Sequence, residues 1–259
     1  MLLIIEALLL ISSALGRDHR DDDNTYTLNM APQSVDDQYK GCKENMKKDV
    51  ETKYLKNELD TSPTFNAAWK KVKVEPPYDI LSKDHKIAIY VYSDASVYND
   101  FNSDTRSGKE QYKNKKYKWY SLYFLLTDAI QILKSKTEQE NKCYSTCRRT
   151  KVKFNENALN TEVRFGSLAS SSPCPKKKIF GDESCFEIYT CEGADVSKYS
   201  KLPEEKEVLI PPYEKFKVKA VKKRKDYKDL WCETVFVLNT TGTISNLNCA
   251  VAQKDKANL

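Results

Sequence analysis

Glu205 and Glu207 are two positions apart and directly precede the apolar run Val208–Ile210, which ends at Pro211 and Pro212. Residues separated by two positions project to the same side of an extended chain. We therefore expect both carboxylates to enter one pocket. Such a pair can divide its work, with one carboxylate stabilising a cation while the other orients a nucleophile and takes its proton.

Two groups of polar residues upstream offer partners for these carboxylates. Cys147–Thr150 reads Cys-Arg-Arg-Thr, and Ser170–Ser172 is a run of hydroxyls. A guanidinium presents a fork of N–H donors that suits pyrophosphate oxygens, and a hydroxyl can hold a sugar or a carboxylate. Each group alone is also typical of an ordinary surface, so it is their order and spacing together that indicate an active site.

The composition argues against several other kinds of site. With seven glycines and no Gly-x-Gly-x-x-Gly or Gly-x4-Gly-Lys, we expect no Rossmann or P-loop phosphate site. His19 and His85 form no metal-binding pair, and we expect His85 to be an exposed turn residue. A zinc site at Cys143 and Cys147 would lack a second matched pair of ligands. We therefore expect neither a metal centre nor a histidine-based triad.

The charge is only mildly basic, since 43 Lys and Arg against 37 Asp and Glu give +6. The strongest basic run, Lys222–Lys225, contains no interleaved aromatic residue that could stack on a base. It follows the alternating segment Phe216–Ala220, so we interpret it as a solvated turn. No nucleic-acid partner is expected.

The first residues indicate export. Residues 1–16 combine an apolar core, Ala7–Ile11, with the small-x-small ending Ala14–Gly16, which is typical of a cleaved signal peptide. A membrane anchor is the alternative, but the apolar segment is short for a bilayer span. We expect residues 17–29 to be a flexible lead and residues 30–259 to form one domain. Because the C-terminal residues carry no anchor signal, we predict a secreted protein without a transmembrane segment.

Eight cysteines in an exported chain predict four disulfides, but spacing alone does not choose their pairing. They are Cys42, Cys143, Cys147, Cys174, Cys185, Cys191, Cys232 and Cys249. Asn239 begins the triplet Asn-Thr-Thr, a glycosylation signal that is consistent with export.

The apolar patterns predict helices first and strands afterwards. Three helices are predicted from stripes that contain Cys42, Met46, Val50 and Tyr54; Phe65, Ala68, Trp69 and Val72; and Trp119, Leu122, Leu126, Ile130 and Leu133. Ser62 and Pro63 should begin the second helix, and Pro76-Pro77 should end it. Strands are predicted at Lys86–Tyr92, Val163–Phe165, Cys185–Tyr189, Val208–Ile210, Lys215–Val221 and Trp231–Leu238. This order predicts an α+β fold, with an N-terminal helical half packed on a mainly antiparallel β half.

The sequence also resembles a known family, the arginine-specific mono-ADP-ribosyltransferases of the vertebrate secreted or cell-surface type. That family shares its active-site chemistry with the cholera-toxin class of bacterial toxins. The similarity extends from about Met30 to Cys249. It is carried by Val35–Cys42, Val97–Asn102, Leu122–Thr127, Val163–Gly166, Ser170–Ser172, Thr190–Ala194 and Glu205–Glu214. The last segment, Glu-x-Glu-Val-Leu-Ile-Pro-Pro-Tyr-Glu, is the most specific.

The resemblance implies roles for four residues. Arg148 matches the arginine of the family's first strand, Ser170 its Ser-x-Ser strand, and Glu205 and Glu207 its Glu-x-Glu turn. NAD+ would lie in a cleft between the sheets of a β-sandwich core, as a substrate and not as a bound cofactor. Arg148 and Ser170 would hold NAD+, and Glu207 would stabilise an oxocarbenium-like ribose. Glu205 would orient the arginine of a protein or a small guanidine.

The chain departs from the family pattern Tyr-Arg-Gly-Thr, because Cys147 replaces the aromatic residue and Arg149 replaces the glycine. Two alternatives to an arginine ADP-ribosyltransferase remain open. One is an NAD+ glycohydrolase that uses water at the same site, and the other is a secreted binding protein that has lost activity. Only the two departures favour the second. We expect Arg164 to be structural and the protein to be a monomer.

The resemblance also implies disulfide pairings. It pairs Cys42 with Cys249 and Cys143 with Cys191, and it leaves Cys174–Cys185 and Cys147–Cys232 as additional bonds.

Overall fold

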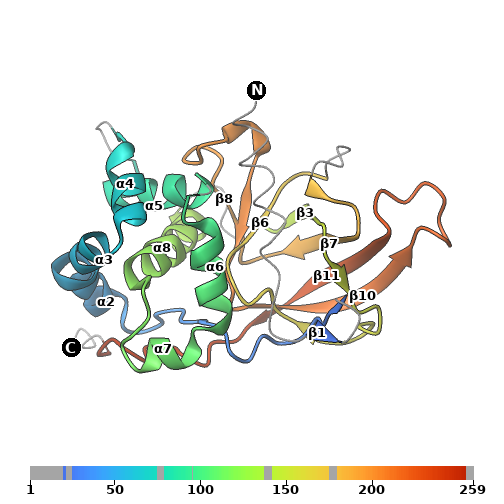
Figure 1. Cartoon of the computed structure of the whole chain (residues 1–259), viewed down its shortest axis with the longest axis horizontal. Coiled ribbons are helices and arrows are strands. Elements are labelled where there is room, and N and C mark those ends of the chain that lie inside the picture. Colours follow the sequence, from blue (N-terminus) through green and yellow to red (C-terminus); the bar gives the residue numbers. More distant parts are fainter. Residues whose placement is uncertain are drawn as a thin grey trace.

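The computed structural model describes residues 20–21, 25–74, 79–94, 96–136, 142–174 and 180–254. The expected signal peptide, His19 and Pro76-Pro77 lie outside these residues. The described chain forms three layers (Figure 1): helices, a three-stranded sheet and a five-stranded sheet. The predicted α+β fold with its helices first is confirmed.

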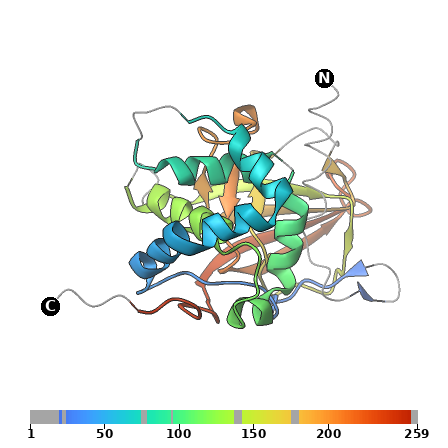
Figure 2. The same cartoon turned by 60° about the vertical axis from the view of Figure 1, so that its left-hand side comes forward.

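The helical layer spans residues 43–136 and covers one side of the molecule (Figure 2). Its helices are α2 (Lys43–Asp49), α3 (Leu55–Thr61), α4 (Pro63–Lys71), α5 (Lys83–Ser93), α6 (Tyr98–Ser107), α7 (Lys109–Lys113) and α8 (Tyr120–Lys136). The predicted cap of α4 is confirmed, since Ser62 Oγ accepts the Phe65 N–H at 3.3 Å. Among the described helices, none is long and apolar enough to cross a membrane.

The first predicted stripe is confirmed, with an irregularity that explains its spacing. Residues Val50–Tyr54 form a π-helix between α2 and α3, and Met46, Val50 and Tyr54 are buried in the helical core. An α-helix has about 3.6 residues per turn, so steps of four residues drift around its axis. A π-helix has more residues per turn, so the same steps of four residues move the side chains around the axis in the opposite direction. The two movements offset each other and keep the stripe facing the core.

The strand predicted at Lys86–Tyr92 is wrong, because this segment lies within helix α5. Its β-branched and aromatic residues suggested a strand, but six of the eleven residues of α5 are buried, so no broad polar face reveals the helical period. Ser82 caps the helix by accepting the His85 N–H at its side-chain oxygen, and Nδ1 of the His85 ring lies 2.8 Å from the same oxygen. His85 is therefore buried, not exposed, with its Nε2 3.1 Å from Asp128 Oδ2.

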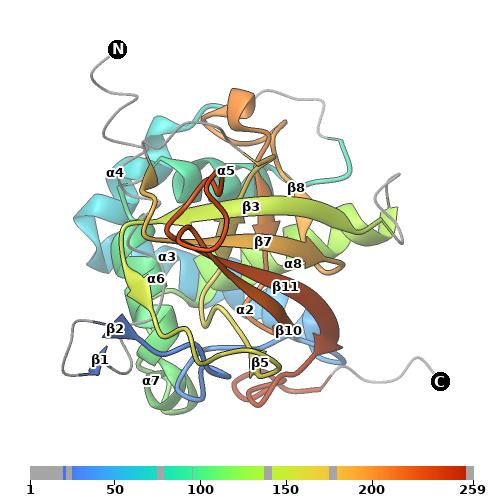
Figure 3. The ribbon, with the colours of Figure 1, turned by 90° about the vertical axis from the view of Figure 1, so that its right-hand side faces the viewer.

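The five-stranded sheet has the order β3-β7-β11-β10-β5 (Figure 3). Its strands are β3 (Tyr144–Thr150), β7 (Ser184–Thr190), β11 (Thr234–Thr243), β10 (Glu214–Lys223) and β5 (Glu162–Val163). Neighbouring strands are antiparallel except β7 and β11, which are parallel. One face of the sheet buries Phe186, Phe216 and Phe236 in a core of its own.

The three-stranded sheet has the order β6-β9-β8 and is antiparallel throughout. Its strands are β6 (Ala169–Ser171), β9 (Val208–Ile210) and β8 (Ala194–Asp195). Successive side chains of a strand point to opposite faces, and here Leu209 packs with the helices while Ile210 packs with the five-stranded sheet. The two sheets therefore form the expected sandwich, and one of them has mixed pairing.

A small third sheet joins residues before residue 30 to the domain. β1 (Arg20–Asp21) pairs with β2 (Thr25–Tyr26), which runs parallel to β4 (Lys153–Phe154). The ring of Tyr26 packs on that of Phe154, with 5.9 Å between centroids. The segment expected to be a flexible lead therefore contributes two short strands, β1 and β2.

The eight cysteines form four disulfides, and none is free. The bonds are Cys42–Cys249, Cys143–Cys191, Cys147–Cys174 and Cys185–Cys232. The first two agree with the pairings that the resemblance implied. Because Cys143 and Cys147 are both in disulfides, neither is available to zinc.

The implied pairings of the other four cysteines are wrong, and strand register explains why. Cys147 in β3 forms a bridge with Ser172, which brings it next to Cys174 two residues later. Cys185 in β7 lies beside the start of β11, close to Cys232. The observed bonds therefore each join residues that strand pairing has already brought together.

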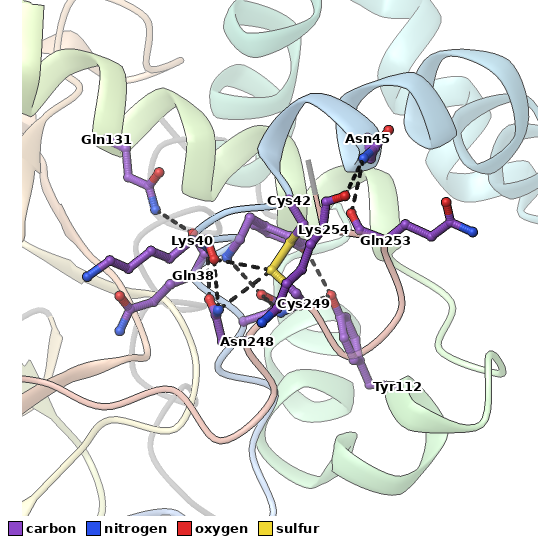
Figure 4. The surroundings of a disulfide bond; sticks show 12 residues. Gln38, Lys40, Cys42, Asn45, Tyr112, Gln131, Asn248, Cys249, Gln253 and Lys254 are labelled. Carbon is purple, nitrogen blue, oxygen red and sulfur yellow. Dashed lines mark hydrogen bonds between the residues drawn. A yellow bond between two sulfur atoms is a disulfide. The ribbon is translucent and has the colours of Figure 1, made fainter. Parts of the chain in front are cut away.

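The Cys42–Cys249 disulfide lies in a network that joins the first and last parts of the domain (Figure 4). The Asn248 side chain makes two hydrogen bonds with the Lys40 backbone, at 2.8 and 3.0 Å. The Asp37 carboxylate accepts the Cys249 N–H at 3.0 Å. Hydrogen bonds therefore hold the two segments together in addition to the disulfide.

Arg164 and Asp36 form a buried ion pair, with Nη1 2.6 Å from Oδ2 and side chains 1% and 0% exposed. Arg164 also donates to the carbonyl oxygens of Met30 and Ala31. Asp36 accepts the Leu247 N–H at 2.9 Å. The pair connects three distant segments, and this supports the expected structural role of Arg164.

Arg164→Met should destabilise the fold by about 3–5 kcal/mol, because it leaves the charge of Asp36 buried without its cation. Urea unfolding of the wild type and the variant would measure this loss. Lys215→Met is a matched control that removes a more exposed ion pair, 3.1 Å from Glu162, and it should cost about 1 kcal/mol or less. Similar losses in the two variants would contradict the role of the buried pair.

Candidate active site

A pocket opens where β3 of the five-stranded sheet meets the three-stranded sheet. Its lining consists of Cys147, Arg148, Arg149, Ser170, Ser171, Ser172, Phe180, Glu205 and Glu207. Strand β3 contributes the arginines, β6 contributes Ser170 and Ser171, and the turn before β9 contributes the glutamates. The fold thus brings together all four residues that the sequence singled out.

Arg148 is the buried cation of this pocket, 2% exposed. Its Nη1 donates to the carbonyl oxygen of Ser170, and its Nη2 lies 3.5 Å from the Tyr98 hydroxyl. The preceding residue, Cys147, exchanges two backbone hydrogen bonds with Ser172, at 2.8 and 3.0 Å. Strands β3 and β6 are therefore connected directly beside Arg148, which fixes the position of its guanidinium.

Glu207 is the buried carboxylate, 6% exposed. Its Oε2 accepts a hydrogen bond from Ser200 Oγ at 3.4 Å, and the Ser170 side chain also hydrogen-bonds to it. Burial raises the pKa of Glu207, while the two serines and the charge of Arg148 lower it. Protein groups therefore take the place of water around this carboxylate.

Glu205 reaches the pocket by a different route from the one predicted. Pro203–Glu205 form a 3-10 turn, and Lys206 is left-handed with φ 49°. The prediction of an extended chain at Glu205–Glu207 is therefore wrong. This turn directs both carboxylates into the pocket, and the alternation of side chains along a strand does not. Burial, followed by the charges of Glu207 and Glu204, raises the pKa of Glu205 to about 7.

Arg149 occupies the position of the family's glycine and also lines the pocket, but its guanidinium binds different groups from that of Arg148. It pairs with Cys185 within regular strand β3, so its side chain points to the other face. There Nη1 donates to the carbonyl oxygens of Gly181 and Trp231, at 3.2 and 3.0 Å. The guanidinium also lies 4.5 Å from the centre of the Trp231 ring. These contacts explain how the strand accommodates an arginine in place of glycine at position 149 while Arg148 keeps its own partners.

Three residues of the site were not predicted to belong to it. Tyr98 contacts Arg148, Ser200 contacts Glu207, and Phe180 lines the pocket. Tyr98 lies in one of the segments that resemble the family, which is the signal that could have found it. A single Ser or Phe in a loop carries no such signal, because only the tertiary fold brings it to the pocket.

The other candidate features of the sequence lie outside this pocket. Carboxylates pair with three residues of the basic run: Lys222 with Glu187, Lys223 with Glu156, and Arg224 with Glu233. Lys222 and Lys223 belong to β10, so the interpretation of the basic run as a solvated turn is only partly correct. Within the described part of the chain, no group of three or more His, Cys, Asp or Glu could hold a metal ion.

The sequence matches the family described as ART: NAD:arginine ADP-ribosyltransferase over residues 28–234. The chain belongs to this family. Human ecto-ADP-ribosyltransferase 4 is 33% identical over 93% of this chain and 79% of its own length. The erythroblast NAD(P)(+)--arginine ADP-ribosyltransferase of Gallus gallus is 30% identical over 83% of this chain and 76% of its own length.

The fold of this ADP-ribosyltransferase family member also agrees with solved structures. It is similar to the eucaryotic mono-ADP-ribosyltransferase ART2.2, with a TM-score of 0.71 and 27% identity over 88% of this chain and all of that chain. A variant of ART2.2 in complex with NAD gives a TM-score of 0.70 at 25% identity. The β-sandwich with a helical layer is therefore the fold of the family.

Proposed function

We propose that this ADP-ribosyltransferase family member transfers ADP-ribose from NAD+ to arginine side chains of proteins and releases nicotinamide. The observation that carries the proposal is the convergence of Arg148, Ser170, Glu205 and Glu207 on one pocket. The name of the Gallus gallus relative, an NAD(P)(+)--arginine ADP-ribosyltransferase, supports this acceptor. The NAD complex of ART2.2 supports the donor.

In the proposed reaction the bond between C1′ of the ribose and nicotinamide breaks, and its electron pair leaves with nicotinamide. Positive charge then develops on the ribose, as in glycoside hydrolysis. Glu207, buried beside Arg148, stabilises that charge. Arg148 holds pyrophosphate or ribose oxygens with its guanidinium fork, and Ser170 braces Glu207 through their hydrogen bond.

Glu205 acts on the acceptor in this scheme. A guanidinium has a pKa above about 12, so it needs a group that orients it and takes its proton as its nitrogen attacks C1′. The pKa of Glu205 is about 7, and therefore a large share of the carboxylate is ionised near neutral pH. Glu205 is more exposed than Glu207, which leaves it accessible to a bulky acceptor. NAD+ is the substrate, and no resident cofactor is proposed.

One experiment separates this proposal from the two alternatives. The purified protein is incubated with labelled NAD+ and either agmatine or an acceptor protein. A labelled adduct supports arginine transfer, whereas free ADP-ribose alone indicates an NAD+ glycohydrolase. The absence of any turnover would contradict both and would favour a binding protein on the same fold.

We further propose that the protein is secreted as a single folded domain and acts as a monomer. The four disulfides support export, as does the ecto-enzyme name of the human relative. N-terminal sequencing of protein collected from culture medium would test cleavage after residue 16, and light scattering would test the monomer.

Asn239 is the proposed glycosylation site. It lies in β11 and is partly exposed. Thr241→Ala removes the hydroxyl that the signal requires and should lower the mass of the secreted protein by one glycan. Thr240→Ala changes only the middle position and should keep the glycan. Equal masses for the wild type and Thr241→Ala would contradict the proposal.

A further inference from the structure

The acceptor loop, residues 196–207, carries both active-site glutamates and connects β8 with β9. A hydrogen bond from the Val196 N–H to the Glu207 carbonyl oxygen, at 3.0 Å, closes its base. Above this base the loop is attached to the helical layer at two aspartates, one before helix α5 and one after it. The positions of Glu205 and Glu207 therefore depend on the helices as well as on the sheets.

The first attachment is at Asp79, which precedes α5. Lys198 Nζ and the Tyr199 hydroxyl lie 2.8 and 2.9 Å from Asp79 Oδ2. Lys86, within α5, lies 3.3 Å from Oδ1. Burial raises the pKa of Asp79, but the hydrogen bonds from these side chains and from the Leu81 N–H outweigh it and hold the pKa well below its usual range.

The second attachment is at Asp94, which follows α5. Lys201 Nζ forms an ion pair with the Asp94 carboxylate, whose side chain is only 10% exposed. The Lys201 N–H also donates to Ser93 Oγ at 2.8 Å. A second cation, Lys71 of α4, lies 3.7 Å from the other Asp94 oxygen. Lys201 is therefore held by both its backbone and its side chain.

Ser200 connects this second attachment to the active site, because it directly precedes Lys201. Its Oγ accepts the Leu202 N–H at 3.2 Å and donates to Glu207 Oε2 at 3.4 Å. A hydrogen bond of that length is near its limit, so a small movement of the loop would break it. Leu202 in turn accepts the Glu205 N–H at its carbonyl oxygen, at 3.1 Å, so holding Lys201 in place also holds the turn that carries Glu205.

We propose that the Lys201–Asp94 ion pair positions the acceptor loop for transfer to arginine. Lys201 and Asp94 are then positioning residues, and this inference rests on the proposed function. Without the pair, the Asp79 attachment and the closed base still hold the ends of the loop, so the domain folds. Glu205 lies in the turn between these fixed points, so its carboxylate is then no longer held in position. Transfer needs Glu205 and should suffer more than hydrolysis, because Glu207 keeps its hydrogen bond with Ser170, which lies outside the loop.

Lys201→Met should lower the rate of transfer to agmatine about tenfold, because a misplaced acceptor group loses its alignment. Hydrolysis of NAD+ should stay within about threefold of the wild-type rate. The ratio of the two products is the decisive quantity, since a general structural defect would lower both in parallel. Lys201→Arg keeps the ion pair and should restore the ratio.

Lys71→Met is the matched control, because it removes the more distant cation from Asp94 without touching the loop. It should leave the product ratio unchanged, and thermal melting should show that all three variants fold. An unchanged ratio in Lys201→Met, or the same change in Lys71→Met, would overturn the proposal. A wild-type protein without any turnover would instead contradict the proposed function.

A second measurement does not depend on activity. A protease that cleaves after glutamate can cut the loop at Glu204 or Glu205 when the loop is mobile. Cleavage there should be faster in Lys201→Met than in the wild type, and unchanged in Lys71→Met. Equal cleavage rates in all three proteins would overturn the positioning role even if the enzyme were inactive.

Discussion

Glu207→Gln should lower both ADP-ribose transfer and NAD+ hydrolysis by about 10²–10³-fold. The amide keeps the size of the side chain and much of its hydrogen bonding, but it lacks the negative charge that stabilises the ribose cation. Both reactions pass through that cation, so both should fall together. Incubation with labelled NAD+ and agmatine measures the two products in the same sample.

The fold of Glu207→Gln provides the control. Burial raises the pKa of Glu207 above its ordinary value, so the stability that protonation contributes is lost as the pH rises through the folded-state pKa. A neutral amide avoids this loss, and the melting temperature at neutral pH should be unchanged or higher. A folded variant with wild-type hydrolysis would show that Glu207 does not stabilise the cation.

Glu205→Gln should separate the two reactions. Transfer to agmatine should fall by about 10²–10⁴-fold, because the base that takes the guanidinium proton is lost, while hydrolysis should continue. Glu204→Gln is the matched control, since Glu204 is the adjacent, exposed carboxylate and does not line the pocket. It should leave both reactions near wild type.

The pH dependence gives an independent test of the same role. Burial and the charges of Glu207 and Glu204 raise the Glu205 pKa to about 7, and a base acts only in its ionised form. The ratio of transfer to hydrolysis should therefore rise as the pH increases through about 7 in the wild type. It should be flat in Glu205→Gln. If Glu205→Gln and Glu207→Gln lost both activities equally, the division of roles would be contradicted.

The residue types of the candidate site could be predicted from the sequence, whereas their geometry could not. Arg148, Ser170, Glu205 and Glu207 lie in short motifs, and all four meet in one pocket. The left-handed conformation of Lys206 is not marked by a glycine, so an extended chain was the natural expectation. The partner of a buried side chain, such as Ser200 for Glu207, depends on how a loop closes in three dimensions.

The order of helices and strands followed from apolar periodicity, and the errors occurred where that signal fails. Helix α5 is buried around much of its surface, so its Ile, Val and Tyr residues resemble a buried strand. The capping box at Ser82 and His85 was the local signal that indicates a helix. The pairing of Cys147 and Cys185 depends on strand register, which sequence spacing does not determine.

The network around Cys42 and Cys249 sets the order of events during synthesis. Its two cysteines are 207 residues apart, and a ribosome adds about 5–20 residues per second. The Cys42 thiol and the Asp37 carboxylate therefore wait on the order of 10–40 s for partners near residue 249 to emerge. We expect the helical layer to remain incompletely closed throughout that interval. During it, we expect the Cys42 thiol to be open to mispairing with earlier-emerging cysteines, and any such bond must be exchanged before Cys42 can pair with Cys249.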